Sequence, residues 1–261
     1  MQRTHKRFHL GIFGSQGKTT YALKFVSNAA SQCVFLFDAE GEFSEVLDLQ
    51  PARTTYELDQ AIRSGWVCFD PHVMFPGELE TALEYFCTLT LEASKRMPGR
   101  KFFVLDEAGT YVTGNFIPKP LKTIAQTGRR YGIDGVFIGQ QPNELHNTIR
   151  CQLTEVVCFQ ITDDTALEFP KKFGFDPEAV RTLPRFGYIC RNNRGGEARS
   201  SPGPSTKASA GRRRSAPEPA CIEEPGQSQS NVTPQADNLL DESQSGESQL
   251  PAASHLAAES Q

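Results

Sequence analysis

A glycine-rich segment near the start of the chain has residue types that bind phosphate. Its residues are Gly14, Ser15, Gln16, Gly17, Lys18, Thr19 and Thr20. An apolar run precedes the segment and a predicted helix begins at its end, so successive backbone N–H groups and a helix N-terminus face an anion. Gly14 and Gly17 can adopt the positive φ that such a loop requires. We therefore interpret the segment as a site for the phosphates of a nucleotide.

Two side chains of this segment have expected roles. Lys18 should reach the β- and γ-phosphates, and the Thr19 hydroxyl should ligate Mg²⁺. The segment departs from the pattern G-x-x-x-x-G-K-S/T, because Ile12 stands where the first glycine is expected and Gly11 lies one residue too early. Either the loop is one residue longer, or Gly14 replaces the missing glycine.

A second segment ends in two adjacent acids. The apolar residues 102–105 are followed by Asp106 and Glu107. Carboxylates at the end of a buried strand are costly unless they face a metal or a polar cleft. We expect Asp106 to hold Mg²⁺ through water and Glu107 to act as general base on the attacking water; the alternative is a solvated Asp-Glu turn. The two segments together predict nucleotide hydrolysis, and ATP is favoured because the chain has no Asn-Lys-x-Asp guanine motif.

Other polar residues could act on the same phosphates. Phosphoryl transfer is mostly charge stabilisation, to which an arginine from a neighbouring subunit often contributes. Arg129 and Arg130 are the candidates, although arginines at a helix C-terminus also interact favourably with its dipole. Gln140 follows the next predicted strand, where its amide could sense the γ-phosphate, and Gln141 is its competitor. A polar residue that merely ends a strand is the simpler alternative.

Apolar runs alternate with helical segments along the first three quarters of the chain. This order predicts an α/β fold with a mostly parallel sheet covered by helices on both faces. Such sheets bind ligands at the carboxyl ends of their strands, and Asp38, Asp70 and Asp106 each end a strand. We predict strands at 8–13, 33–38, 66–70, 102–106, 135–139, 155–161 and 186–190, the last at an edge, helices at 18–28, 56–64, 78–95 and 121–131, and two short helical pieces before the last strand.

Composition divides the chain near residue 194. Residues 195–261 are rich in Gly, Ser, Pro, Gln and Ala, with too little apolar surface to offset chain entropy, so we predict a disordered tail that is either passive or binds a partner. Nine of the 31 acids and five of the 27 bases lie there, which leaves 22 of each in residues 1–194. A neutral folded part exerts no global attraction on nucleic acid. Lys119 and Lys122 could line a pore, or simply be solvated.

Cysteine usage and hydropathy indicate the compartment. The seven cysteines include no C-x-x-C pair, and several lie within apolar strand-like runs, where cysteine behaves as a small hydrophobe. This usage predicts a reducing, cytoplasmic compartment without disulfides or a zinc site. The polar start is not a signal peptide, and no run approaches the ~18 apolar residues of a membrane span.

The order of these motifs resembles the FtsK–HerA superfamily of DNA-pumping ATPases over about residues 8–192. Residues 37–43 are similar to its D-x-x-G-E-Y/F segment, and residues 129–132 to its R-H-Y-G, which places Arg129 on the trans-acting arginine. Residues 138–142 are similar to its T-Q-R-P sensor, with Gln140 as the sensor. Residues 143–163 resemble the end of its core and include Arg150, a second candidate for a phosphate or a neighbour. Gly139 and Arg130 depart from the family pattern.

The resemblance implies a P-loop NTPase fold of the RecA/FtsK-like type over residues 1–194. Small single-domain members are the genome-packaging ATPases of viruses, which implies a DNA translocase that forms a homo-oligomeric ring. It also implies double-stranded DNA and a capsid or portal-vertex protein as partners, in the host cytoplasm or the virion. The alternatives are a Zot-like phage assembly ATPase, which normally carries a membrane span, and a regulatory ATP-binding module that moves no DNA.

Overall fold

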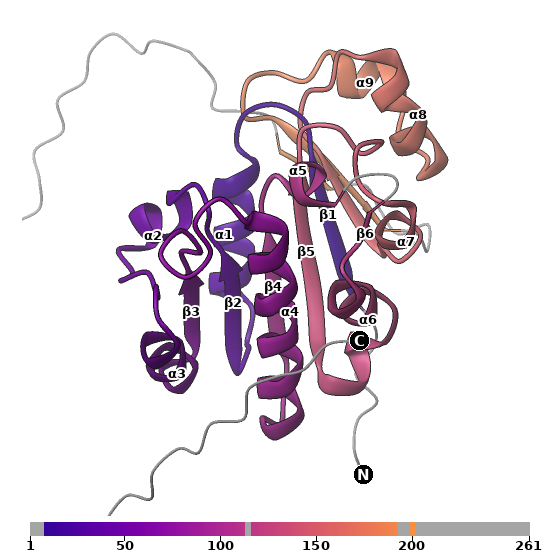
Figure 1. Ribbon diagram of the computed structural model, residues 1–261. Helices are drawn as coiled ribbons and strands as arrows, with labels where there is room; N and C mark the ends of the chain where they lie inside the picture. Colours follow the sequence, from indigo (N-terminus) through magenta and orange to yellow (C-terminus); the bar gives the residue numbers. More distant parts are fainter. Residues whose placement is uncertain (1–7, 113–115, 193–198, 202–261) are drawn as a thin grey trace, which may run out of the picture. The chain divides into compact units, whose positions relative to one another are not determined.

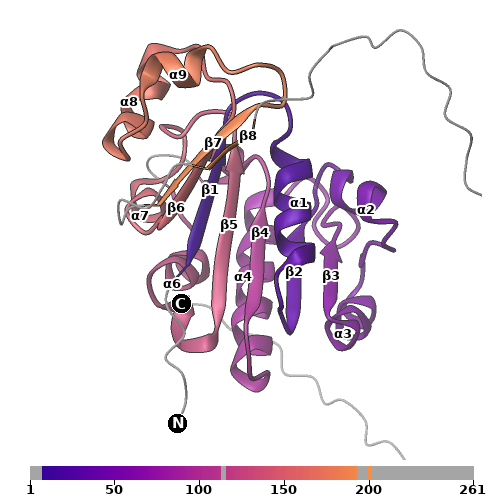
Figure 2. The same ribbon diagram turned by 180° about the vertical axis from the view of Figure 1, so that it is seen from behind.

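Eight strands form one mixed sheet in the computed structural model, which describes residues 8–112, 116–192 and 199–201 (Figures 1 and 2). The order across the sheet is β3-β2-β4-β5-β1-β6-β7-β8, and all pairs from β3 to β6 are parallel. The strands are β1 His9–Phe13, β2 Cys33–Phe37, β3 Trp66–Phe69, β4 Lys101–Leu105, β5 Ile133–Gly139, β6 Glu155–Cys158, β7 Tyr188–Asn192 and β8 Arg199–Ser201. The expected α/β fold with a mostly parallel sheet is confirmed.

Helices cover both faces of the sheet because its central strands are apolar on both sides. Phe35, Phe37 and Phe103 pack on one face with α4 and α6, whereas Leu36 and Val104 pack on the other with α1 and α2. The helices are α1 Lys18–Asn28, α2 Glu42–Leu47, α3 Thr55–Ser64, α4 Leu79–Arg96, α5 Ala108–Tyr111, α6 Lys119–Thr127, the 3₁₀ helix η1 Gly128–Tyr131, α7 Asn147–Arg150, α8 Asp164–Lys172 and α9 Pro177–Arg181. Helices α2, α5 and α7 were not predicted from the sequence.

The last part of the sheet differs from the prediction. The predicted edge strand begins later, at Tyr188, and is not an edge, because β8 pairs with it antiparallel. Arg199–Ser201 fall within the range predicted to be a disordered tail, so that range contributes a strand. The other residues of 195–261 lie outside the described residues, and the division of the chain at residue 194 stays a prediction.

Two other strand boundaries moved for identifiable reasons. β6 ends at Cys158 rather than at residue 161, because the next residues leave the ladder and the Gln160 carbonyl accepts a hydrogen bond from Ser15 N at 3.0 Å. β5 begins two residues earlier than predicted and includes the fully buried Asp134, to which Arg100 Nε donates at 2.6 Å. A buried carboxylate in a strand needs such a charged partner.

The parallel strands bring polar residues to one edge of the sheet. The glycine-rich loop follows β1, Asp38 follows β2, Asp106 follows β4 and Gln140 follows β5. The thiols of Cys33, Cys68, Cys87, Cys151 and Cys158 are free. Among the helices that the structure describes, none is long and apolar enough to cross a membrane.

Candidate nucleotide-binding site

The glycine-rich loop begins at Gly14. Ile12 is fully buried in β1 and pairs with Ile138 and Val157, so the position where the pattern expects a glycine is still part of the strand. Gly14 has a φ of 111°, and a Cβ there would lie 2.8 Å from the backbone of Phe159. Of the two explanations that the sequence left open, the structure selects Gly14 as the glycine that opens the loop.

Backbone hydrogen bonds fix the loop to the two strands beside β1. Gly14 N donates to the Gln140 carbonyl at 3.1 Å and Ser15 N to the Gln160 carbonyl at 3.0 Å. Gly17, with a φ of 109°, is the N-cap of α1 and provides no side-chain cap to the first turn. The N–H groups at the start of a helix are then free to bind an anion, and the helix dipole favours negative charge there.

Lys18 extends over this loop. Its Nζ donates to the Ser15 carbonyl at 3.2 Å, so the ammonium lies on the loop itself. Gln16, on the outer side of the loop, accepts a hydrogen bond from Arg185 Nε at 2.5 Å. The loop therefore combines a cation and helix N–H groups, as the phosphates of a nucleotide require.

The two residues expected to hold Mg²⁺, Thr19 and Asp106, are in direct contact. The Thr19 hydroxyl donates to Asp106 Oδ2 at 3.0 Å and lies 3.3 Å from Glu42 Oε2. Glu107 N donates to the other oxygen of Asp106 at 2.8 Å. Lys18, Thr19, Glu42, Asp106 and Glu107 line one cavity of about 120 Å³.

The electrostatics of this cavity favour a bound cation. Burial raises the pKa of Asp106, and the charges of Glu107 and Glu42 raise it further, against the hydrogen bonds that it accepts. Burial and the nearby acids also raise the pKa of Tyr111 to about 12. Within the described ranges, no group of three or more His, Cys, Asp or Glu side chains could alone hold a metal. Mg²⁺ is usually held by one or two carboxylates together with phosphates and water, and Thr19 with Asp106 fits that pattern.

Glu107 stands in an unusual backbone conformation. Its φ of 42° and ψ of 43° lie in the left-handed region, and it is the N-cap of α5. A non-glycine residue in this region is strained, and such strain is concentrated at functional sites. Glu107 lines the acidic cavity beside Asp106, as a residue that acts on an attacking water must.

Residues 37–43 carry a recognisable motif, but the part that Glu42 plays was not predicted from it. Asp38 is buried and accepts hydrogen bonds from Phe43 N at 3.0 Å and Ser44 N at 2.9 Å. It therefore holds the start of α2, where Glu42 faces Thr19. Asp70, the remaining acid that ends a strand, pairs instead with Arg53 at 2.7 Å. The signal for Glu42 was its place in the D-x-x-G-E-F segment.

The remaining predicted residues lie at opposite ends of β5. Gln140 follows the strand, and its carbonyl holds the first residue of the phosphate loop. Arg129 and Arg130 are exposed in η1, which precedes the strand. Because β5 has seven residues and spans roughly 20 Å, the arginines lie at the sheet edge away from Lys18 of their own copy.

Other cations that the sequence singled out are not part of this site. The Arg150 guanidinium lies 6.0 Å from the centre of the Phe169 ring, a packing contact. Lys119 and Lys122 are exposed on the first turn of α6. The structure therefore brings together the phosphate loop, Asp106, Glu107 and Gln140, and adds Glu42.

Several solved structures of NTPases and ATPases share the fold of this chain. The genome packaging NTPase B204 from Sulfolobus turreted icosahedral virus 2, in complex with AMP, matches with a TM-score of 0.57 and 14% identity over 75% of this chain and 97% of that chain. Its complex with AMPPCP matches with 0.55 and 16% over 74% and 96%. The cytoplasmic domain of the Type VII secretion ATPase EccC from Thermomonospora curvata matches with 0.51 and 15% over 77% and 26%.

These likenesses show that the chain shares the fold of these NTPases. No protein-family model and no curated protein sequence matches the chain. The structural neighbours include nucleotide-bound forms.

Replacing Asp106 by Asn should stabilise the protein and inactivate it. The pKa of Asp106 is raised, so the folded chain retains a proton that the unfolded chain loses, and stability falls as pH rises from about 3.9, the ordinary Asp value, through the raised one. Asp106→Asn should therefore give a higher Tm at pH 7 without nucleotide. ATP hydrolysis should fall by about 100-fold or more, because a bound metal contributes several kcal/mol.

Asp70→Asn is the matched control for this measurement. The Asp70 carboxylate is partly buried, but its ion pair with Arg53 lowers its pKa overall. Its replacement should lower Tm at pH 7, the opposite sign, with the ATPase rate maintained. Thermal scans over a range of pH measure both variants, and a Tm of Asp106→Asn at or below that of the parent would contradict the assignment.

Proposed function

We propose that this chain is a Mg²⁺-dependent ATPase that moves double-stranded DNA, as a homo-oligomeric ring that packages a viral genome. The observation that carries the proposal is the contact of Thr19 with Asp106, beside Glu107. It joins the phosphate loop to the acid pair at one sheet edge, which is the arrangement that P-loop hydrolases need.

The residues of the site divide the hydrolytic step among them. The N–H groups of the loop and Lys18 bind the β- and γ-phosphates, and Thr19 and Asp106 would hold Mg²⁺, which supplies positive charge to the phosphate oxygens. Glu107 takes a proton from a water whose oxygen bonds to the γ-phosphorus. The bond from that phosphorus to the bridging oxygen breaks, which yields ADP and phosphate. Gln140, which follows β5, would contact the γ-phosphate.

The ring is supported by the distance between the two ends of β5. Arg129 and Arg130 are exposed at the edge away from the phosphate loop of their own copy, so either can stabilise the transition state only in a neighbouring copy. The motif order adds that Arg129 matches the trans-acting arginine, and the B204 protein, a genome packaging NTPase, shares the fold. Double-stranded DNA and a capsid or portal-vertex protein are the partners that follow.

Substitutions at Lys18 and Glu107 test the hydrolytic site. Lys18→Ala should weaken ATP binding and abolish hydrolysis. Glu107→Gln should keep ATP binding but lower kcat by about 10²- to 10⁴-fold, because it removes a general base. Glu168→Gln, an exposed glutamate on α8, is the control and should match the parent. Phosphate release and nucleotide binding measure these effects, and an active Glu107→Gln variant would remove Glu107 from the mechanism.

Mixed oligomers test the arginine. Arg129→Ala should lower kcat by about 10³-fold. Because this variant keeps its own Lys18 and Glu107, mixtures of Arg129→Ala copies with inactive Glu107→Gln copies should regain ATPase activity wherever a Glu107→Gln copy supplies the arginine to an Arg129→Ala neighbour. Arg130→Ala is the matched control and should keep the parent rate. If Arg130→Ala is instead the inactive variant that Glu107→Gln copies rescue, the assignment moves by one residue. Mixtures that stay inactive contradict a shared site.

The response to DNA distinguishes a DNA-moving motor from a regulatory ATP-binding module. Linear double-stranded DNA should raise the ATPase rate several-fold, and the protein should displace a DNA-bound roadblock in an ATP-dependent manner. Glu107→Gln is the control for displacement by binding alone. An ATPase rate that double-stranded DNA leaves unchanged, without displacement, would favour the regulatory module.

A further inference from the structure

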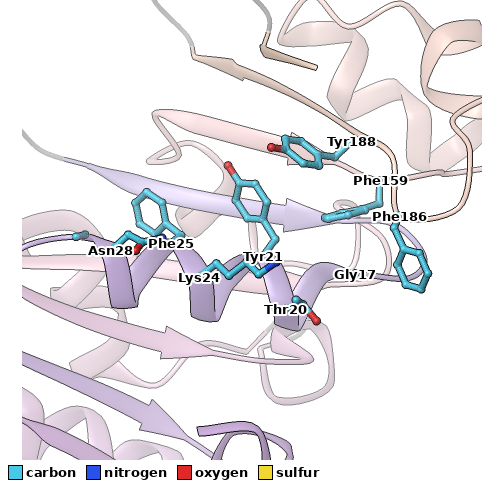
Figure 3. Close-up of a pocket in the computed structure, with 10 residues that line it drawn as sticks. Gly17, Thr20, Tyr21, Lys24, Phe25, Asn28, Phe159, Phe186 and Tyr188 are labelled. Carbon is cyan, nitrogen blue, oxygen red and sulfur yellow. The ribbon is translucent and has the colours of Figure 1, made fainter. Parts of the chain in front are cut away.

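A second cavity begins where the phosphate loop meets α1. It has a volume of about 740 Å³ and runs along α1 on the side that faces Phe159 and Tyr188 (Figure 3). Gly17 and Thr20 form its end at the phosphate loop, so it is continuous with the site described above. The end of the groove at the loop is therefore the space next to the proposed phosphate site.

The floor of this groove is a packed aromatic cluster. The rings of Tyr21 and Tyr188 are 4.9 Å apart between centres, and those of Phe159 and Tyr188 are 5.7 Å apart. The loop lies directly on the cluster, since a Cβ on Gly17 would come within 2.7 Å of the Phe159 ring. Figure 3 shows Tyr21 turned toward Tyr188, with Phe159 between them and Gly17. The floor is therefore apolar and fixed relative to the phosphate loop.

Phe186 differs from these rings because it is exposed. It lines the groove at the loop end, is 44% exposed, and has a φ of 61°. A large apolar ring is costly to expose to water, and a bulky residue is strained in the left-handed region. Of the stacking and edge contacts between aromatic rings within the described ranges, none includes Phe186, so a ring face remains for a ligand.

Arg185 fixes the position of Phe186. Its guanidinium lies 4.9 Å from the centre of the Phe186 ring, and its Nε donates to Gln16 of the phosphate loop at 2.5 Å. One arginine thus connects the exposed ring to the loop that would hold the phosphates. The strained backbone thus holds the ring at the loop end of the groove, and backbone strain of this kind is typical of ligand contacts.

We propose that Phe186 stacks on the nucleobase of the bound nucleoside triphosphate, over the floor of Tyr21, Phe159 and Tyr188. This inference rests on the proposed nucleotide hydrolysis and adds the recognition of the base. Stacking on an aromatic ring suits every base, because each has a π face.

The groove has little that could read the edge of a base. Its polar side chains on α1 are Thr20, Lys24 and Asn28, which are all exposed. The Tyr21 hydroxyl lies near Cys190 and Glu155 instead. Strong discrimination between bases needs buried polar groups that would be left unpaired by the wrong one. The site therefore takes ATP and GTP with similar KM, in contrast to the preference for ATP that the missing guanine motif suggested.

The experiment measures the KM for ATP and GTP, and the inhibition constant of tripolyphosphate, which has no base. Phe186→Ala should raise both KM values about ten-fold, equivalent to about 1.4 kcal/mol of lost stacking, with kcat and the tripolyphosphate constant unchanged. Phe186→Trp should restore the parent KM, whereas Phe186→Leu, which is apolar without a π face, should resemble the alanine variant. Tyr56→Ala, an exposed ring on α3, should match the parent.

The outcomes separate this inference from the proposed function. If the parent hydrolyses ATP and Lys18→Ala does not, but Phe186→Ala keeps the parent KM, the proposed stacking on Phe186 is wrong and the hydrolytic site stands. A leucine variant with the parent KM would reduce the role of Phe186 to apolar contact. A preference of more than ten-fold for ATP over GTP would overturn recognition by stacking. If the parent neither binds nor hydrolyses ATP, both proposals fail.

Discussion

Burial of the Asp106 carboxylate is the constraint on which the site depends. The residue ends an apolar strand, and its burial raises its pKa, so the charged form needs compensation. Hydrogen bonds from the Thr19 hydroxyl and from the N–H of Glu107 supply part of this compensation. The negative charge of Glu42 acts against it. A bound cation would provide the rest, because the negative charges of Glu107 and Glu42 oppose the charged form of Asp106. The fold thus stores an unfavourable charge at the place where Mg²⁺ and phosphates would bind.

The sheet order explains how this contact forms between residues 87 positions apart. β5 lies between β1, which leads into the phosphate loop, and β4, which leads into the acids. The parallel direction puts all three carboxyl ends at one edge, with Gln140 between the loop and the acid pair. The same strand begins at the opposite edge, next to Arg129 and Arg130. A single copy therefore cannot bring all these groups to one phosphate.

The phosphate loop separates two environments of different chemistry. On one side, a small acidic cavity next to Asp106 and Glu107 suits a metal and an attacking water. On the other, a larger aromatic groove that includes Phe159 and Phe186 suits a planar base. Gly14 and Gly17 allow the loop to pass between them, since a side chain at either position would collide with Phe159. The proposed hydrolysis and the proposed base recognition thereby fall on different elements.

Local patterns in the sequence determined the phosphate loop, the acid-ended strand β4 and the exact span of α1, because phosphate chemistry and hydrophobic periodicity depend on near neighbours. Tertiary structure alone decided that Gly14 opens the loop, that Glu42 faces Thr19, that β8 joins the sheet and that Phe186 stands at the end of the groove. Each of these depends on which distant segment lies alongside, and neither residue type nor spacing encodes such a pairing directly.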